Sequence, residues 1–137
     1  NFALSSPESL VTTVDLPEPL VELYKESNSV QAQERWKKWG VEDRIEEVLI
    51  DSKLFVRHEK FELIFIDSGH EYEDIKADTE NALKMLSKGG TIIWHDFYTR
   101  SFPGVTAYLA ELSEYMKIKW INKRENWLET SLCYFKF

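Results

Sequence analysis

The sequence predicts an α/β fold built on a mostly parallel sheet whose last strand runs antiparallel. The first observation is the segment Phe61–Phe97, in which an apolar run is followed by a helical repeat and then by a second apolar run. This order is typical of a right-handed crossover between two parallel strands. The second observation is at the C-terminus, where too few residues join the strand-like runs 117–121 and 131–137 for a parallel crossover, so these runs are expected to pair antiparallel.

Four parallel strands are expected, each a short apolar or β-branched run bounded by turn residues. They lie near residues 11–15, 45–50, 62–67 and 91–95. The run before Asp67 is short and apolar, as expected for a strand that is buried on both faces.

The central helix is predicted from Glu71 onward, because apolar residues recur there at helical spacing. The residues on this stripe are Tyr72, Ile75, Thr79, Ala82, Leu83 and Leu86. Acidic residues in the first turn and lysines near the end suit the helix dipole, and Gly89–Gly90 supplies a left-handed stop. Further helical stretches are expected near 20–24, 30–39 and 105–116.

Composition limits the classes of function. A chain of 137 residues, 43% of them hydrophobic, has the size and the core of one domain. Its net charge of −7 argues against a nucleic acid or an anionic membrane as the main partner. The single Cys133 excludes an internal disulfide, and the sequence shows neither an apolar run of membrane-spanning length nor a signal peptide, so we expect a cytoplasmic protein.

Polar residues follow both strands of the central segment. Asp67 and His70 follow the first strand, and His95 and Asp96 follow the second. The carboxyl ends of parallel strands share one edge of the sheet, where open α/β sheets bind ligands, so we expect these four side chains to gather there. Carboxylates with imidazole suit a divalent cation, and a histidine beside it suits general-base catalysis. The alternative is that each of them caps a helix or lies in a solvated loop.

The central segment resembles the second half of class I S-adenosylmethionine-dependent methyltransferases. The likeness rests on Ile66–His70, on His95–Phe97 and on the following Pro103–Val105, and it covers roughly residues 11–137. Around the site the chain is most similar to the macrocin and mycinamicin type of sugar O-methyltransferase. The resemblance implies a Rossmann-like methyltransferase sheet and methyl transfer to an oxygen or nitrogen of a small-molecule acceptor, most often a hydroxyl.

The resemblance also implies roles for four residues toward the cofactor S-adenosylmethionine. Asp15 would accept hydrogen bonds from the ribose hydroxyls, Asp51 and Ser52 would lie beside the adenine, and Asp67 would lie nearest the reactive methyl group. The alternative is structural. In that case Asp15 is a turn residue before Pro17, and Asp51 closes its strand with an Asx-type turn.

A base and a metal site are implied by the same resemblance. His70 would remove the proton of the acceptor, and Asp67 and Asp96 would bind Mg²⁺. The chain departs from the group at His95, which stands where the group has an acid. The imidazole nitrogen could still ligate a metal, although magnesium prefers oxygen. The alternative for His70 is that it merely caps the helix.

The glycine-rich cofactor loop of this family has no counterpart in the sequence. The loop normally precedes the acid at the position of Asp15 by about 20 residues, and counting back from Asp15 runs past residue 1. We therefore expect a partial domain whose first strand is missing. The alternative is a complete but degenerate chain that has lost cofactor binding.

Two other functions stay open at this point. A non-catalytic Rossmann-like domain would use the fold for binding or protein contacts. A metal hydrolase would use Asp67, His70 and Asp96, and would bind no S-adenosylmethionine. The polar loop 122–130, with Trp127, would either cover the site or mediate contacts in a homo-oligomer.

Overall fold

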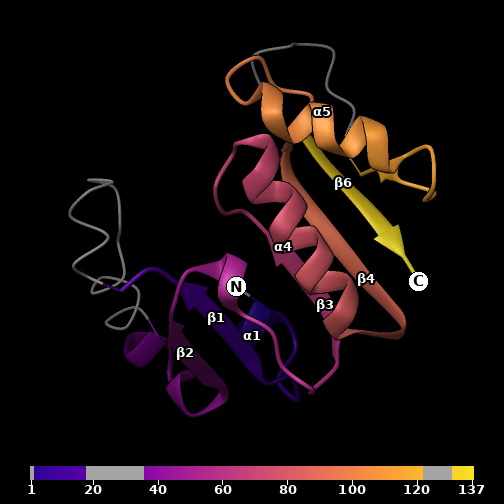
Figure 1. The fold of residues 1–137 in the computed structure, drawn as a ribbon. Coiled ribbons are helices and arrows are strands. Elements are labelled where there is room, and N and C mark those ends of the chain that lie inside the picture. The colour runs from indigo at the N-terminus through magenta and orange to yellow at the C-terminus, as the bar shows by residue number, and fades with distance from the viewer. Residues whose placement is uncertain (1, 18–35, 122–130) are drawn as a thin grey trace. The chain divides into compact units, whose positions relative to one another are not determined.

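The computed structural model describes residues 2–17, 36–121 and 131–137 (Figure 1). Two compact units make up the chain, Asn1–Phe55 and Val56–Phe137. The helix expected near 20–24, most of the helix expected at 30–39 and the loop 122–130 lie outside the described residues. That the whole chain forms one partial methyltransferase domain stays a prediction.

The first unit contains a pair of parallel strands, as the sequence predicts. Strand β1 (Val11–Asp15) pairs with β2 (Ile45–Leu49) in a register that runs from Val11 beside Ile45 to Asp15 beside Leu49. A short helix, α1 (Phe2–Ser5), precedes β1, and the single 3₁₀ turns η1 (Glu42–Arg44) and η2 (Ser52–Leu54) flank β2. The Arg44 guanidinium donates to the carbonyl oxygen of Ala3 at 2.8 Å, which satisfies a carbonyl of α1.

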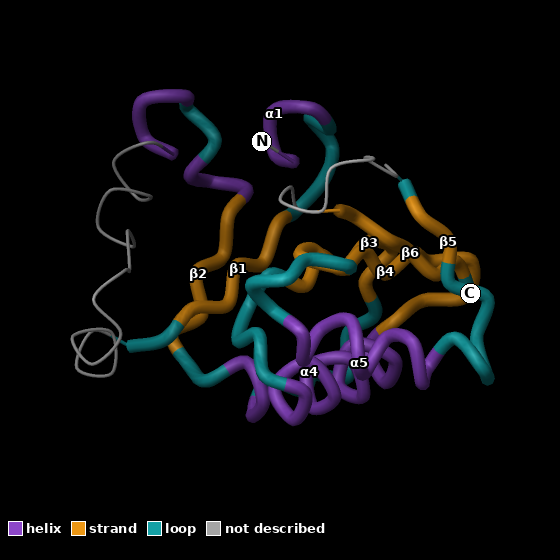
Figure 2. Tube along the Cα trace, turned by 90° about the horizontal axis from the view of Figure 1, so that it is seen from above, coloured by secondary structure: helices purple, strands orange, loops and turns teal. Residues whose placement is uncertain are grey.

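The second unit contains a four-stranded sheet in the order β3-β4-β6-β5, whose strands are labelled in Figure 2. Its strands are β3 (Phe61–Ile66), β4 (Leu86–Phe97), β5 (Lys119–Trp120) and β6 (Ser131–Lys136). Strands β3 and β4 are parallel, and β6 is antiparallel to both β4 and β5. The predicted antiparallel last strand is therefore confirmed. Strands β1 and β3 belong to different sheets, and the expectation that the first strand of the domain is missing stays a prediction.

Two helices, α4 (Tyr72–Met85) and α5 (Pro103–Leu112), lie on the same side of this sheet (Figure 2). Alternate residues of a strand face the same way, so one face of β3 and β4 is buried against these helices. The core between them consists mainly of large apolar side chains: Ile66, Ile75, Ala82, Leu86, Ile92, Trp94, Phe97, Val105, Tyr108, Leu109 and Cys133. None of the helices in the described ranges combines the length and the apolar character needed to cross a membrane.

Trp94 is fully buried at the centre of this core. Its indole Nε1 donates to the hydroxyl oxygen of Thr79 on α4 at 2.9 Å. This bond supplies the partner that a buried indole N–H requires, and it fixes the register of α4 on β4.

The predicted end of the central helix was wrong. Helix α4 ends at Met85, and Leu86 has the extended backbone of the first residue of β4. Pairing with β3 explains the difference, because Leu86 lies opposite Phe61 and is buried in the core. Gly89 has a φ of 80°, but it lies within β4 and does not end the helix. Helix α5 also ends at Leu112, earlier than the predicted residue 116.

Candidate functional site

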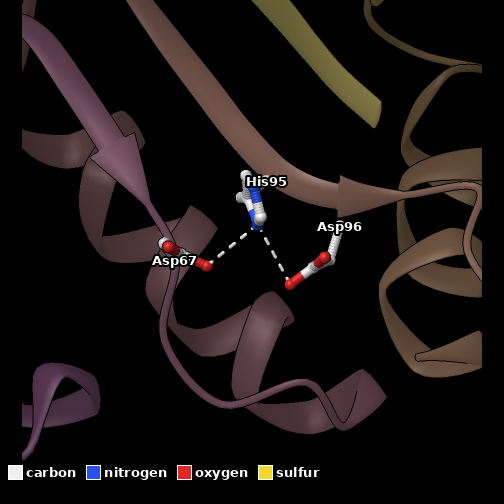
Figure 3. Close-up of side chains that lie close together, drawn as sticks. All are labelled: Asp67, His95 and Asp96. Carbon is white, nitrogen blue, oxygen red and sulfur yellow. Dashed lines mark ion pairs between the residues drawn. The ribbon is translucent and has the colours of Figure 1, made fainter. Parts of the chain in front are cut away.

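The parallel pairing of β3 and β4 brings two predicted site residues together. Ile66 lies beside Trp94 in the register, so the residues that follow them, Asp67 and His95, meet at the carboxyl edge of the sheet. His95 Nδ1 lies 3.2 Å from Asp67 Oδ1 (Figure 3). The side chain of Asp67 is exposed, whereas that of His95 is half-buried.

Asp96 connects this pair to His70. Its Oδ2 atom accepts a hydrogen bond from His70 Nε2 at 2.8 Å and lies 3.1 Å from His95 Nδ1. The carboxylate is buried, with only 4% of the residue exposed. A buried carboxylate requires such partners, because water cannot solvate its charge. The structure thus gathers all four residues that the sequence predicts at this edge.

The backbone at Asp96 aims its side chain toward the two histidines. Asp96 has a φ of 57° and Tyr98 a φ of 62°, the left-handed region that few residues other than glycine adopt. The pairing of β4 with β6 is also irregular between Trp94 and Phe97, as at a β-bulge, which redirects side chains. A residue other than glycine in this region costs about 1–3 kcal/mol, and such residues are concentrated at functional sites.

The loop between β3 and α4 is fixed at both sides. Ser68 donates a hydrogen bond to the buried carboxylate of Asp78 on α4. The imidazole of His70 stacks on the ring of Phe102, with the ring centres 3.8 Å apart and the planes 19° from parallel. The N-cap of α4 is Glu71, so His70 does not cap the helix, and that alternative was wrong.

Phe102 is not among the site residues predicted from the sequence. It stands immediately before Pro103, the first residue of α5, so a loop aromatic next to a helix-opening proline was the only signal in the sequence. Its contact with His70 depends on how α5 packs beside the loop, which no local pattern encodes.

The three residues predicted as metal ligands fit a divalent cation. One ligand atom from each of Asp67, His95 and Asp96 lies within 4.8 Å of the other two. His95 Nδ1 and Asp96 Oδ1 are buried without a hydrogen-bond partner among the described residues. A nitrogen between two carboxylates favours a borderline ion such as Mn²⁺, Fe²⁺ or Zn²⁺ over Mg²⁺, which prefers oxygen.

The residues predicted to bind the cofactor in the first unit lie at or just after strand ends: Asp15 is the last residue of β1, and Asp51 and Ser52 follow β2. Asp15 Oδ1 accepts from the backbone N–H of Leu16 at 2.8 Å, and Asp51 Oδ1 accepts from that of Lys53 at 3.0 Å. These are the turn contacts that the structural alternative predicts. Exposed Asp15 at a strand end also fits recognition of a ribose. The roles of Asp15, Asp51 and Ser52 toward a cofactor stay predictions.

Comparison with known proteins identifies the family. The sequence profile of the family described as "Methyltransferase domain" matches residues 4–97, which is more than half of the chain. The chain therefore belongs to this family. No curated protein matches the sequence.

Solved structures share the fold at low sequence identity. The N-methyltransferase NodS from Bradyrhizobium japonicum WM9 is 17% identical with a TM-score of 0.60, and 93% of this chain covers 72% of NodS. A Staphylococcus aureus protein assigned as a caffeoyl-CoA O-methyltransferase is 16% identical with a TM-score of 0.71, and 99% of this chain covers 68% of it.

A Nostoc punctiforme protein assigned as an O-methyltransferase is 13% identical with a TM-score of 0.67, and 99% of this chain covers 47% of it. The chain thus spans about half of the length of that relative. The predicted Rossmann-like methyltransferase fold is confirmed. Family and fold together define a protein with a methyltransferase domain.

Proposed function

We propose that this protein transfers a methyl group from S-adenosylmethionine to a hydroxyl of a small-molecule acceptor. The family match supports methyl transfer, and a structure of NodS that contains S-adenosyl-L-homocysteine, the demethylated product, supports the cofactor. The observation that favours oxygen is the His70–Asp96 pair, with its 2.8 Å hydrogen bond at the carboxyl edge of the sheet. A hydroxyl must lose its proton as it is methylated, so it gains most from a positioned base.

His70 is the base in this mechanism. Its Nε2–H donates to Asp96, which leaves the lone pair of Nδ1 to accept the proton of the acceptor hydroxyl. Asp96 holds this tautomer and stabilises the imidazolium that forms. When bound, S-adenosylmethionine supplies an electrophilic methyl group, and the electron pair of the broken carbon–sulfur bond stays on sulfur. The remaining contribution of the protein is alignment of the two reactants.

Asp67, His95 and Asp96 would hold a divalent cation, whose chemistry would be to lower the pKa of the acceptor hydroxyl. The near-contact of His95 Nδ1 with both carboxylates supports this site. Calorimetric titration of the metal-free protein should show tighter binding of Mn²⁺ than of Mg²⁺, and His95→Ala should remove that preference. Equal affinity for the two ions would contradict the nitrogen ligand.

The remaining assignments follow the same proposal. Asp15, Asp51 and Ser52 bind the ribose and adenine of the cofactor, and Asp67 lies nearest its methyl group. Asp67 and His70 follow the first strand of the central segment, and Asp96 follows the second. These positions support placing the protein with the macrocin type of sugar O-methyltransferase. The net charge of −7 argues against a nucleic acid or an anionic membrane as the main partner. As further parts of the proposal, the acceptor is a small molecule, and the protein is cytoplasmic and forms a homo-oligomer.

The test is methyl transfer from isotopically labelled S-adenosylmethionine to a panel of sugar, phenol and amine acceptors, with the full natural protein. The proposal predicts label on a hydroxyl oxygen and calorimetric binding of S-adenosylmethionine. Transfer only to amines would contradict O-methylation. Absence of cofactor binding would favour the non-catalytic domain or, if hydrolysis is found, the metal hydrolase.

A further inference from the structure

We propose that Phe102 is a positioning residue, which holds the imidazole of His70 in the orientation needed to accept a proton. This inference rests on the proposed role of His70 as the base. It adds a residue and a physical device to that role: the ring of Phe102 fixes the plane of the imidazole, while Asp96 fixes one of its edges.

Two contacts restrict the His70 ring from different directions. The hydrogen bond from Nε2 to Asp96 leaves the ring free to turn about the line of that bond. The ring of Phe102, stacked at 3.8 Å and 19°, blocks this rotation by covering one face. The side chain of His70 is still 34% exposed, so part of it is accessible to a substrate. Both contacts together leave the Nδ1 edge pointing in one direction.

Phe102 is itself held in place by the fold. It is half-buried and packs against the core cluster of the second unit, and the next residue, Pro103, opens α5. Proline restricts the backbone of the residue before it, which limits where the Phe102 ring can lie. The stacking partner of His70 is thus anchored in the core, whereas His70 lies in a loop.

Gly104 sets the distance between the two segments. A Cβ atom at this position would lie 2.6 Å from the carbonyl oxygen of His70 and 2.5 Å from the backbone nitrogen of Tyr72. Both are backbone atoms, so a side chain at residue 104 would push α5 away from the loop. The start of α5 therefore lies directly against the loop backbone, and this close approach brings Phe102 onto His70.

A small rotation of a catalytic base has a large effect on rate. Misplacement of a reacting group by about 1 Å can reduce the rate about 10²-fold. Removing the flat ring of Phe102 should therefore lower kcat by about 10–10²-fold, while the affinity for S-adenosylmethionine stays near the wild-type value. If Phe102 contributed only to stability, its substitution would not lower kcat while leaving the affinity for S-adenosylmethionine unchanged.

The experiment compares Phe102→Leu and Phe102→Met, which lose the flat ring but keep apolar volume, with Phe102→Tyr, which keeps the ring. Phe135→Leu is the matched control, because Phe135 is half-buried against the same core but lies on β6. We expect low kcat for the Leu and Met variants, recovery in the Tyr variant and near-normal kcat for the control. If only one of the Leu and Met variants folds, that variant is sufficient for the test.

Proton NMR gives a readout that does not depend on activity. The His70 ring signals, identified by their loss in His70→Ala, should lie upfield because of the Phe102 ring current and should move downfield in Phe102→Leu but not in Phe102→Tyr. Normal kcat or unmoved His70 signals in Phe102→Leu would overturn the inference about Phe102. Equal losses of kcat in the Leu and Tyr variants would also overturn it. None of these results would affect the proposed role of His70. Normal kcat in His70→Ala would overturn the proposed base itself.

Discussion

Asp96 determines the geometry of the candidate site more than any other single residue. Its buried carboxylate accepts a hydrogen bond from His70 and lies beside His95, so it links the predicted base to the predicted metal ligands. Its left-handed backbone is one that aspartate tolerates better than most residues do, because its short polar side chain can bond locally. An imidazole beside a buried carboxylate is well suited to accept a proton.

Asp15 offers a separate test at the residue scale. We expect Asp15→Ala in the full natural protein to weaken S-adenosylmethionine binding by about 1.5–3 kcal/mol, the range for a hydrogen bond to a charged group. Calorimetry measures this directly, and Glu8→Ala, an exposed acid of the same unit, is the control. An unchanged dissociation constant would leave Asp15 with only its contact to the Leu16 N–H.

The gathering of Asp67, His70, His95 and Asp96 could be predicted because it depends only on where two parallel strands end. The Asp96–His70 hydrogen bond could not, because it requires the positive φ of Asp96 and the local shift in strand pairing. The Phe102 contact depends on the packing of α5 beside the loop, which a loop aromatic before Pro103 does not by itself indicate.

At the scale of elements, the positions of β1, β2, β3 and β6 were predictable because turn residues bound each of these strand-like runs, whereas β4 begins at Leu86, five residues before the predicted strand. The end of α4 was not predictable, because Leu86 suits a helical stripe and a buried strand equally well. Pairing with Phe61 decides between them, and the Ser87 hydroxyl adds a hydrogen bond to the Phe61 carbonyl oxygen at 3.1 Å. Tertiary contacts thus overrode helical periodicity at this position.

The contact of α4 with β4 depends on the buried Thr79–Trp94 hydrogen bond. We expect Thr79→Val to lower the free energy of unfolding by about 1–3 kcal/mol, because it leaves the Trp94 N–H buried without a partner. Chemical denaturation measures the loss, and Thr79→Ser, which keeps the hydroxyl, is the control. If the Val and Ser variants are equally stable, the hydrogen bond contributes nothing.

At the scale of the whole molecule, the chain consists of two compact units, and the residues predicted to bind the cofactor occur in both. Asp15, Asp51 and Ser52 belong to the first unit, and Asp67 belongs to the second. No sequence pattern reports how such units are arranged, so the cofactor assignments rest on the family resemblance and the ends of the strands. The site around His70 lies entirely within the second unit and carries the mechanism.

Global stability should fall at alkaline pH, partly because of Cys133. Burial raises the pKa of this thiol to about 12, so the folded protein keeps a proton that the unfolded chain releases at lower pH. The stabilisation is therefore complete below the ordinary thiol pKa and is lost as pH rises through about 12. Denaturation from pH 8 to about 12 should show a shallower decline for Cys133→Ala than for the wild type. Equal declines in the free energy of unfolding of the two proteins would contradict this role of Cys133.

The most direct test of the mechanism is the turnover of His70→Ala with the acceptor identified by the labelled-methyl assay. If His70 takes the acceptor's proton, kcat should fall by about 10²–10⁴-fold, the range for general acid–base catalysis, while the dissociation constant of S-adenosylmethionine stays near the wild-type value. His58→Ala, which removes an exposed histidine of the same unit, should leave both quantities unchanged. Near-normal kcat in His70→Ala would contradict the role of His70 as the base.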